Sequence, residues 1–248
     1  MEVHHHPHVE KKKFKEYFFE FIMIFLAVTL GFFAESYREG VVNKEKEIHY
    51  IKNLVADLKK DTADVGYAIW YQEKYLSKKM DSSIHIPIER LKNINAQDTF
   101  YHYFLFFYTF NYVFYQNNNT ISQLKTAGGF SVVREKNVID SISDLTIFYD
   151  RYVKLNGDYY ITSTLDVVHA AQPIMKLMES PAREDDPALT IIPTNAEFFM
   201  SYDKPLLQQL YNRIVAERGN LEGYIILEKV YQKKAEGLIN FLKQQYHL

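Results

Sequence analysis

Apolar residues recur along most of this chain at three- and four-residue steps, the spacing of one face of an α-helix. A clear series lies between residues 139 and 152, and no stretch alternates for long with the period of two that strands require. Asp203 and Pro205 predict the start of a further helix, which we expect to end at residues 219–220 because a glycine and an asparagine follow one another there. A last helix is predicted over residues 221–248. The pattern therefore predicts an all-α protein.

The middle of the chain is divided by glycines and prolines. Residues 100–115 carry no charge and are mostly Phe and Tyr, so we expect a buried central helix there, with contact with a lipid surface as the alternative. Residues 120–127 predict a helix that ends at a pair of glycines. Residues 157–179 predict another helix. The prolines and acidic residues between 181 and 193 predict a surface connection.

The longest apolar run lies near the start of the chain. Residues 17–34 read YFFEFIMIFLAVTLGFFA, eighteen residues with one charged side chain, Glu20. A helix of this length is roughly 27 Å long, close to a hydrocarbon core of about 30 Å. We therefore predict a transmembrane helix over residues 17–36. The alternatives are a buried helix of a soluble domain and a signal peptide.

The lysines before this run predict its orientation. Four of them lie between residues 11 and 15, whereas the flank after the run mixes basic and acidic residues. Since Lys and Arg are enriched on the cytoplasmic side of a span, we expect the His- and Lys-rich residues 1–16 in the cytoplasm and residues beyond about 38 outside it. In a bacterium this topology means an inner-membrane protein with a periplasmic C-terminal domain. The absence of cysteine fits either compartment.

One face of the predicted span is narrow, rich in small residues and acidic at one end. At 100° per residue, five positions fall on this stripe: Glu20, Ile24, Ala27, Gly31 and Ala34. Ala27 and Gly31 form a small-xxx-small pair, which lets two membrane helices approach closely. We interpret the stripe as a helix-packing face. The alternative is a chance arrangement in which Glu20 reaches back to the cytoplasmic headgroups.

The seven-residue spacing of this stripe continues beyond the predicted span. Val41, Ile48 and Val55 continue it, and Ile51 and Leu58 occupy the other apolar position of the heptad, which Lys44 interrupts. No proline lies between Pro7 and Pro87, so one helix can run from about residue 14 to about residue 80. We predict a helical stalk over residues 37–80 with a coiled-coil seam between subunits, followed by a helical domain over residues 81–248. The equal alternative is that residues 41–58 pack on other helices of the same chain.

Two parts of the sequence resemble a known family. The first is FKEYFFEFIMIFLAVTLGFFAES followed by EKEIHYIKNLVADLKKDT, and the second is TISQLKTAGGFSVVREKNVIDSISDLTIFYDRY, with a Leu-x-x-x-Gly-Gly turn between helices. With the opening MEVHHHPH, they resemble an uncharacterised, Bacteroidota-type family of single-span membrane proteins. The similarity covers under half of the chain. It implies a fold and a membrane location and assigns no activity to any residue.

Candidate chemistry is sparse. The sequence has none of the common catalytic or nucleotide-binding motifs and no cysteine, so we expect neither enzymatic activity nor a bound cofactor. Four histidines near the start offer imidazoles, which suit Zn, Cu and Ni: His4, His5, His6 and His8. In a symmetric oligomer one or two from each subunit could meet on the axis. The alternative is a flexible tail. Asp57, Asp61 and Asp64 share one helix side among lysines, and we expect them to be solvated.

The charge of the chain indicates which kinds of partner to expect. The net charge is −2 and no basic cluster recurs after the first lysines, which gives no reason to expect nucleic-acid binding. We therefore predict a membrane-anchored, homo-oligomeric structural or interaction protein, with the lipid bilayer and other copies of itself as partners. The alternatives are an oligomeric cation- or proton-conducting protein that uses Glu20 and the N-terminal histidines, and an accessory subunit of a larger membrane complex.

Overall fold

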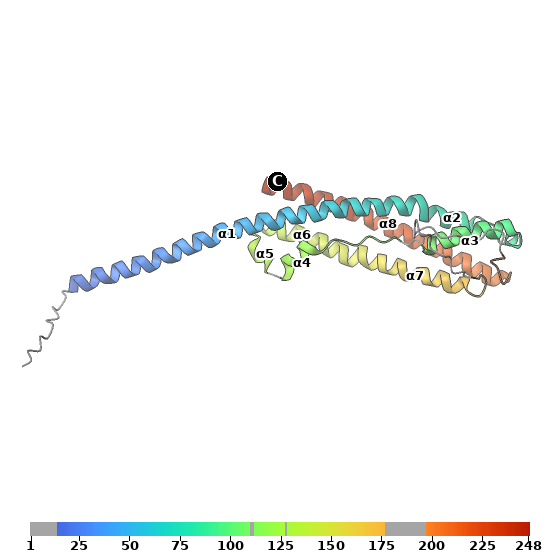
Figure 1. Cartoon of the computed structure of the whole chain (residues 1–248), viewed down its shortest axis with the longest axis horizontal. Helices are drawn as coiled ribbons and strands as arrows, with labels where there is room; N and C mark the ends of the chain where they lie inside the picture. The colour runs from blue at the N-terminus through green and yellow to red at the C-terminus, as the bar shows by residue number, and fades with distance from the viewer. Residues whose placement is uncertain (1–13, 110–111, 127, 177–196) are drawn as a thin grey trace, which may run out of the picture.

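The computed structural model describes residues 14–109, 112–126, 128–176 and 197–248. Within these residues every regular element is a helix, as Figure 1 shows, and the all-α prediction is confirmed. An isolated antiparallel bridge between Met175 and Phe199 is the one extended pairing in the described part of the chain.

The first helix is long and nearly continuous. Helix α1 spans Phe14–Tyr71, passes through one π-helical turn at Gln72–Leu76, and continues as α2, Ser77–Ile84. The predicted uninterrupted helix from about residue 14 to about residue 80 is therefore confirmed. A 3₁₀ turn at Ile88–Lys92 follows Pro87, whose fixed φ and missing N–H prevent a further helical turn.

The aromatic region forms a helix and then an extended segment. Helix α3 spans Ile94–Thr109 and buries several rings, as expected: Phe100, Tyr101 and Phe104. The chain is not helical over residues 112–118, so the prediction of a helix up to residue 115 is wrong at its end. Short helices α4, Asn119–Thr126, and α5, Gly129–Val132, follow. Gly128 between them has φ 67°, the left-handed conformation expected at such a turn.

Two further long helical stretches complete the helical body of the protein. Helix α6, Lys136–Phe148, continues through a π-helical turn at Tyr149–Lys154 into α7, Leu155–Ala171. Helix α8 spans Lys204–Tyr246, and its N-cap residue Asp203 accepts a hydrogen bond from the Leu206 amide at 3.0 Å, as the sequence predicts.

The predicted break at residues 219–220 is wrong, because α8 runs through it without interruption. A glycine in a helix interior is unfavourable by about 1 kcal/mol relative to alanine. Buried apolar residues on both sides of Gly219 outweigh this, since each fully buried Leu or Ile side chain contributes about 1.5–3 kcal/mol. Among them are Leu210, Ile214, Leu221 and Leu238.

Helix α8 packs against α1, α2, α6 and α7, and together they form an elongated bundle from which the first part of α1 projects alone (Figure 1). Contact between α1 and the body begins at Gly40, whose carbonyl accepts from Arg134, and the first buried side chain of α1 is Glu47. Within residues 37–80, the predicted stalk therefore stands clear of the body only at its start. The part from Glu47 onwards belongs to the same core as residues 81–248.

The glycine at residue 157 is required by a close approach. A Cβ atom on Gly157 of α7 would lie 2.8 Å from Val113 Cγ1 and 3.1 Å from the Tyr224 ring. The extended segment can cross α7 here only because residue 157 has no side chain. By contrast, a Cβ on Gly223, on the outer side of α8, would meet nothing within 4 Å.

We expect Gly157→Ala to lower the free energy of unfolding by about 1–3 kcal/mol, because the methyl group overpacks the core. Gly223→Ala is the matched control and should raise it by about 0.5–1 kcal/mol through helix propensity alone. Urea unfolding of both variants measures the difference. Equal effects in the two variants would contradict the close approach.

Candidate functional site

The extended segment at residues 112–118 runs through a helical body and so lacks helical partners for its backbone groups. Three side chains accept its N–H bonds: Tyr224 from Phe114 at 3.1 Å, Tyr149 from Gln116 at 3.0 Å, and Asp61 from Asn117 at 2.9 Å. Gln72 donates to the Tyr112 carbonyl at 3.0 Å. An unpaired buried backbone group is unfavourable by several kcal/mol, so these side chains hold the segment in place. We call them, with Asp57, Glu228 and Tyr231, the polar belt.

Asp57 secures the point where the segment becomes helix α4. Its carboxylate accepts from the Thr120 amide at 3.1 Å, from the Thr120 hydroxyl at 2.6 Å and from the Asn117 side chain at 3.2 Å. The carboxylate therefore caps the N-terminus of α4 from the neighbouring helix α1. The prediction that Asp57, Asp61 and Asp64 are all solvated is wrong for Asp61, which is 1% exposed.

Both π-helical turns lie at this belt. Gln72 is the first residue of one and Tyr149 the first residue of the other, and both side chains are buried against the segment. A π-turn inserts one residue into a helix and so shifts the face that its side chains present. The two turns let Gln72 and Tyr149 reach the segment while the helices on either side keep their apolar faces in the core.

Glu228 is the most deeply buried acid of the belt. Gln72 Nε2 lies 3.4 Å from its Oε1, whereas Glu228 Oε2 and Gln72 Oε1 have no hydrogen-bond partner among the described residues. Burial raises the pKa of Glu228 to about 8, against opposing hydrogen bonds from Tyr224 and Gln72. The carboxyl group is therefore mostly protonated at neutral pH.

Asp61 behaves similarly but less strongly. Burial raises its pKa to about 6, while hydrogen bonds from Asn117 and Tyr231 oppose the shift and nearby Asp57 and Asp64 add to it. Tyr231 donates to Asp61 at 3.2 Å and accepts from Gln116 Nε2 at 2.9 Å. The belt is thus a network with two buried carboxyl groups, Asp61 and Glu228, whose pKa values burial raises toward neutral pH.

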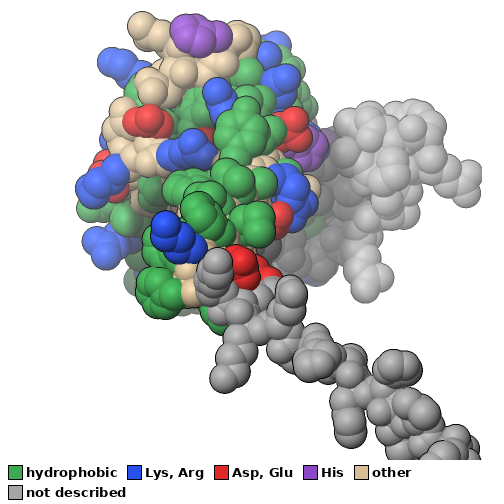
Figure 2. Space-filling model, turned by 90° about the vertical axis from the view of Figure 1, so that its left-hand side faces the viewer, with side chains coloured by type: hydrophobic (Ala, Val, Ile, Leu, Met, Phe, Trp, Pro, Cys, Tyr) green, Lys and Arg blue, Asp and Glu red, His purple; other side chains and the backbone are tan. Residues whose placement is uncertain are grey.

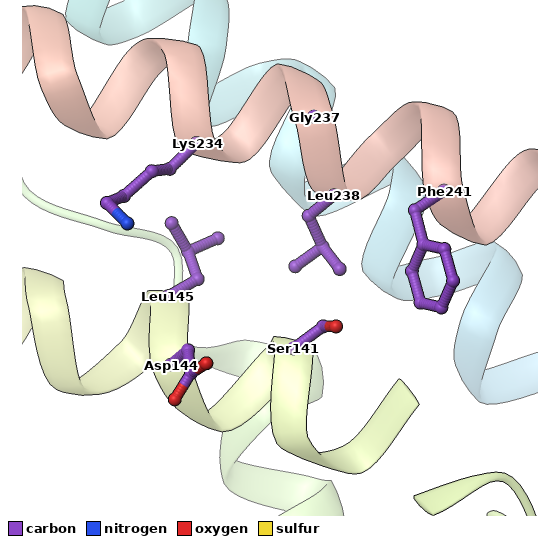
Figure 3. Close-up of a pocket in the computed structure, with 7 residues that line it drawn as sticks. All are labelled: Ser141, Asp144, Leu145, Lys234, Gly237, Leu238 and Phe241. Carbon is purple, nitrogen blue, oxygen red and sulfur yellow. The ribbon is translucent and has the colours of Figure 1, made fainter. Parts of the chain in front are cut away.

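A second candidate is the groove between α6 and α8 shown in Figure 3. Leu145, Leu238 and Phe241 line it, with Gly237, Ser141, Asp144 and Lys234. The Ser141 hydroxyl donates to the Asn137 carbonyl at 2.8 Å, and the lining residues include no histidine to act as its base. The groove is a shallow surface feature without an assembled catalytic pair.

The third candidate is the projecting part of α1. It belongs to the one helix in the described part of the chain that is long and apolar enough to cross a membrane. No residue in the most apolar eighteen-residue stretch of this helix is buried. Large side chains such as Phe18, Ile24 and Phe33 are more than half exposed there. A soluble protein rarely exposes so continuous an apolar surface.

The structure leaves most of the predicted stripe exposed, and Glu20 is partly buried. Ile24 is 65% exposed, and a Cβ on Gly31 would meet nothing within 4 Å. Glu20, Ala27 and Ala34 lie along the same projecting helix.

The predicted heptad seam is divided by the body. Ile51, Val55 and Leu58 lie in the core of the same chain, Ile48 is partly buried and Val41 is exposed. The proposed metal ligands His4, His5, His6 and His8 lie outside the described residues.

Sequence reasoning missed the polar belt. The signal was present, because Asp61 and Gln72 lie on the same three- and four-residue series as Leu54, Leu58 and Val65. Glu228 lies likewise between Tyr224 and Tyr231. A polar residue at a core position of a helix predicts a buried polar partner.

Comparison with known proteins finds no match to this chain among protein-family models, curated proteins or solved structures.

We expect the free energy of unfolding to fall by about 2–4 kcal/mol between pH 6 and pH 9. The ordinary glutamate pKa is 4.5 and the folded value for Glu228 is about 8, so the folded state binds more protons in this window and loses stability as pH rises through it. Glu228→Gln, which cannot ionise, should remove most of this loss. Glu236→Gln, an exposed control on the same helix, should lose as much stability over this pH range as the wild type. Denaturant unfolding at each pH measures the free energy of unfolding of the wild type and both variants. Equal pH dependence in these three proteins would contradict a buried neutral Glu228.

Proposed function

We propose that this chain is a single-pass membrane protein that holds a helical body at the outer surface of a bacterial inner membrane and acts there as a homo-oligomeric structural or interaction protein. The observation that carries the proposal is the uncovered apolar length of α1, which continues without a break into the core of the body. Burying this surface in lipid removes it from water, the dominant favourable term for such side chains.

The orientation rests on charge. Lys11, Lys12, Lys13 and Lys15 precede the apolar length, and the residues after it are of mixed sign. This asymmetry supports a cytoplasmic N-terminus and a periplasmic body. The role that we propose is not enzymatic. The polar belt supports this, because its buried polar groups hold residues 112–118 in place.

Assembly rests on the stripe of Glu20, Ile24, Ala27, Gly31 and Ala34. Within a bilayer, small residues let helix backbones approach closely, and a carboxylate favours a protein or water neighbour over lipid. Ile24 and Gly31 of this stripe are exposed, so they are accessible to a second copy.

A reporter that fluoresces only in the cytoplasm should stay dark when it is fused after Leu248, and the same reporter fused before Met1 should be bright. Alkaline carbonate should leave the protein in the membrane pellet. A bright C-terminal fusion, or release by carbonate, would overturn the proposed topology.

Replacing Gly31 by Phe should reduce crosslinking between copies in membranes by about tenfold, because the larger side chain separates the two helices. The matched control is Leu30→Phe, one position away on another side of the same helix. Unchanged crosslinking in Gly31→Phe, or an equal loss in both variants, would place the assembly face elsewhere.

A further inference from the structure

A cavity of about 450 Å³ lies where α1 joins the body. Its walls come from α1, from the connection between α5 and α6, and from the end of α8. The lining residues are Lys44, Glu47, Ile48, Arg134, Glu135, Gln245, Tyr246 and His247. Figure 2 views the molecule from the end at which α1 projects and shows Lys, Arg, Asp and Glu side chains among apolar ones.

The cavity lies close to the edge of the proposed membrane span. Gly40 is four residues beyond residue 36, a rise of about 6 Å along a helix. The interfacial layer on each side of a bilayer is about 5–8 Å thick. Arg134 donates to the Gly40 carbonyl at 3.0 Å, so in the proposed topology its guanidinium lies at the depth of lipid phosphates. Lys44 is one turn further along, and side chains on a helix lean toward its N-terminus, here toward the membrane.

The cavity carries both signs of charge. Arg134 and Lys44 supply cations, while Glu47 and Glu135 supply carboxylates. Glu47 Oε1 already accepts from the Arg134 amide at 3.1 Å and from the Tyr246 hydroxyl at 2.6 Å, which fixes the acidic wall. The last carbonyls of α8 add partial negative charge on the same side.

His247 ends helix α8 at the rim of the cavity. Its φ of 53° makes it the one non-glycine residue with positive φ in the described part of the chain. This conformation is common at the residue that ends a helix, and the His247 N–H donates to the Lys243 carbonyl, so His247 closes the last turn of α8 beside the cavity.

We propose that this cavity binds the headgroup of a zwitterionic phospholipid, with the phosphate on Arg134 and Lys44 and the ammonium group on the acidic wall. The assignment rests on the proposed membrane anchoring for its depth. A bound headgroup fixes the body against the bilayer surface at a second point besides the span.

The test uses the full-length protein purified from membranes in mild detergent, with bound phospholipid counted by mass spectrometry. Wild-type protein should retain zwitterionic phospholipid near one per chain, and Lys44→Gln with Arg134→Gln should retain at least fivefold less. Lys136→Gln, a cation on α6 outside the cavity lining, is the matched control and should retain the wild-type amount. Thermal unfolding shows that each variant is folded.

Glycerophosphoethanolamine should displace the lipid, and inorganic phosphate at the same concentration should not. Equal lipid in wild type and double variant, preferential retention of anionic lipid, or equal displacement by inorganic phosphate would each overturn the assignment. A protein that carbonate strips from membranes but that still binds glycerophosphoethanolamine would overturn the membrane proposal and keep the cavity assignment.

Discussion

The continuity of α1 is the constraint on which the rest of the structure depends. One unbroken ladder of backbone hydrogen bonds joins the apolar residues after Phe14 to the core residues around Leu58. A helix transmits orientation along its axis, since bending it sharply requires a proline, a π-turn or a disrupted bond, and none lies between Phe14 and Tyr71. The apolar end and the body are therefore parts of one helix, and in the proposed topology the body's position relative to the membrane follows from the point at which this helix leaves the lipid.

The structure of the helical body depends on a second constraint, the extended segment that passes through it. A bundle of helices satisfies its own backbone groups, but an extended segment passing through it does not. Residues 112–118 are accommodated by polar side chains from three helices, by two π-turns and by the missing side chain of Gly157. The buried acids follow from this requirement. Asp61 accepts a backbone N–H, and Glu228 is buried beside Tyr224 and Gln72, so both belong to the packing of the segment.

The sequence predicted the helical class, the long first helix and the caps at Gly128 and Asp203, because local propensity and spacing decide these features. It misplaced the end of the aromatic helix and predicted a break at residue 219, because tertiary burial overrode propensity at both points. Asp61 was assigned to solvent because its neighbours in the sequence are lysines, whereas its burial depends on Tyr231, 170 residues away. Such distant contacts decide which helix covers which face, and the spacing of apolar residues along the sequence does not predict them.

The most direct test of the account measures the rod itself in a bilayer. The chain has no cysteine, so cysteines at Val28 and Lys59 can carry two spin labels without further changes. These exposed positions are separated by 31 residues of α1, about 46 Å along a straight helix. Electron–electron distance measurement in nanodiscs should give one narrow distribution near this length. A broad distribution, or a clearly shorter distance that indicates a bend near Gly40, would contradict a rigid connection between span and body.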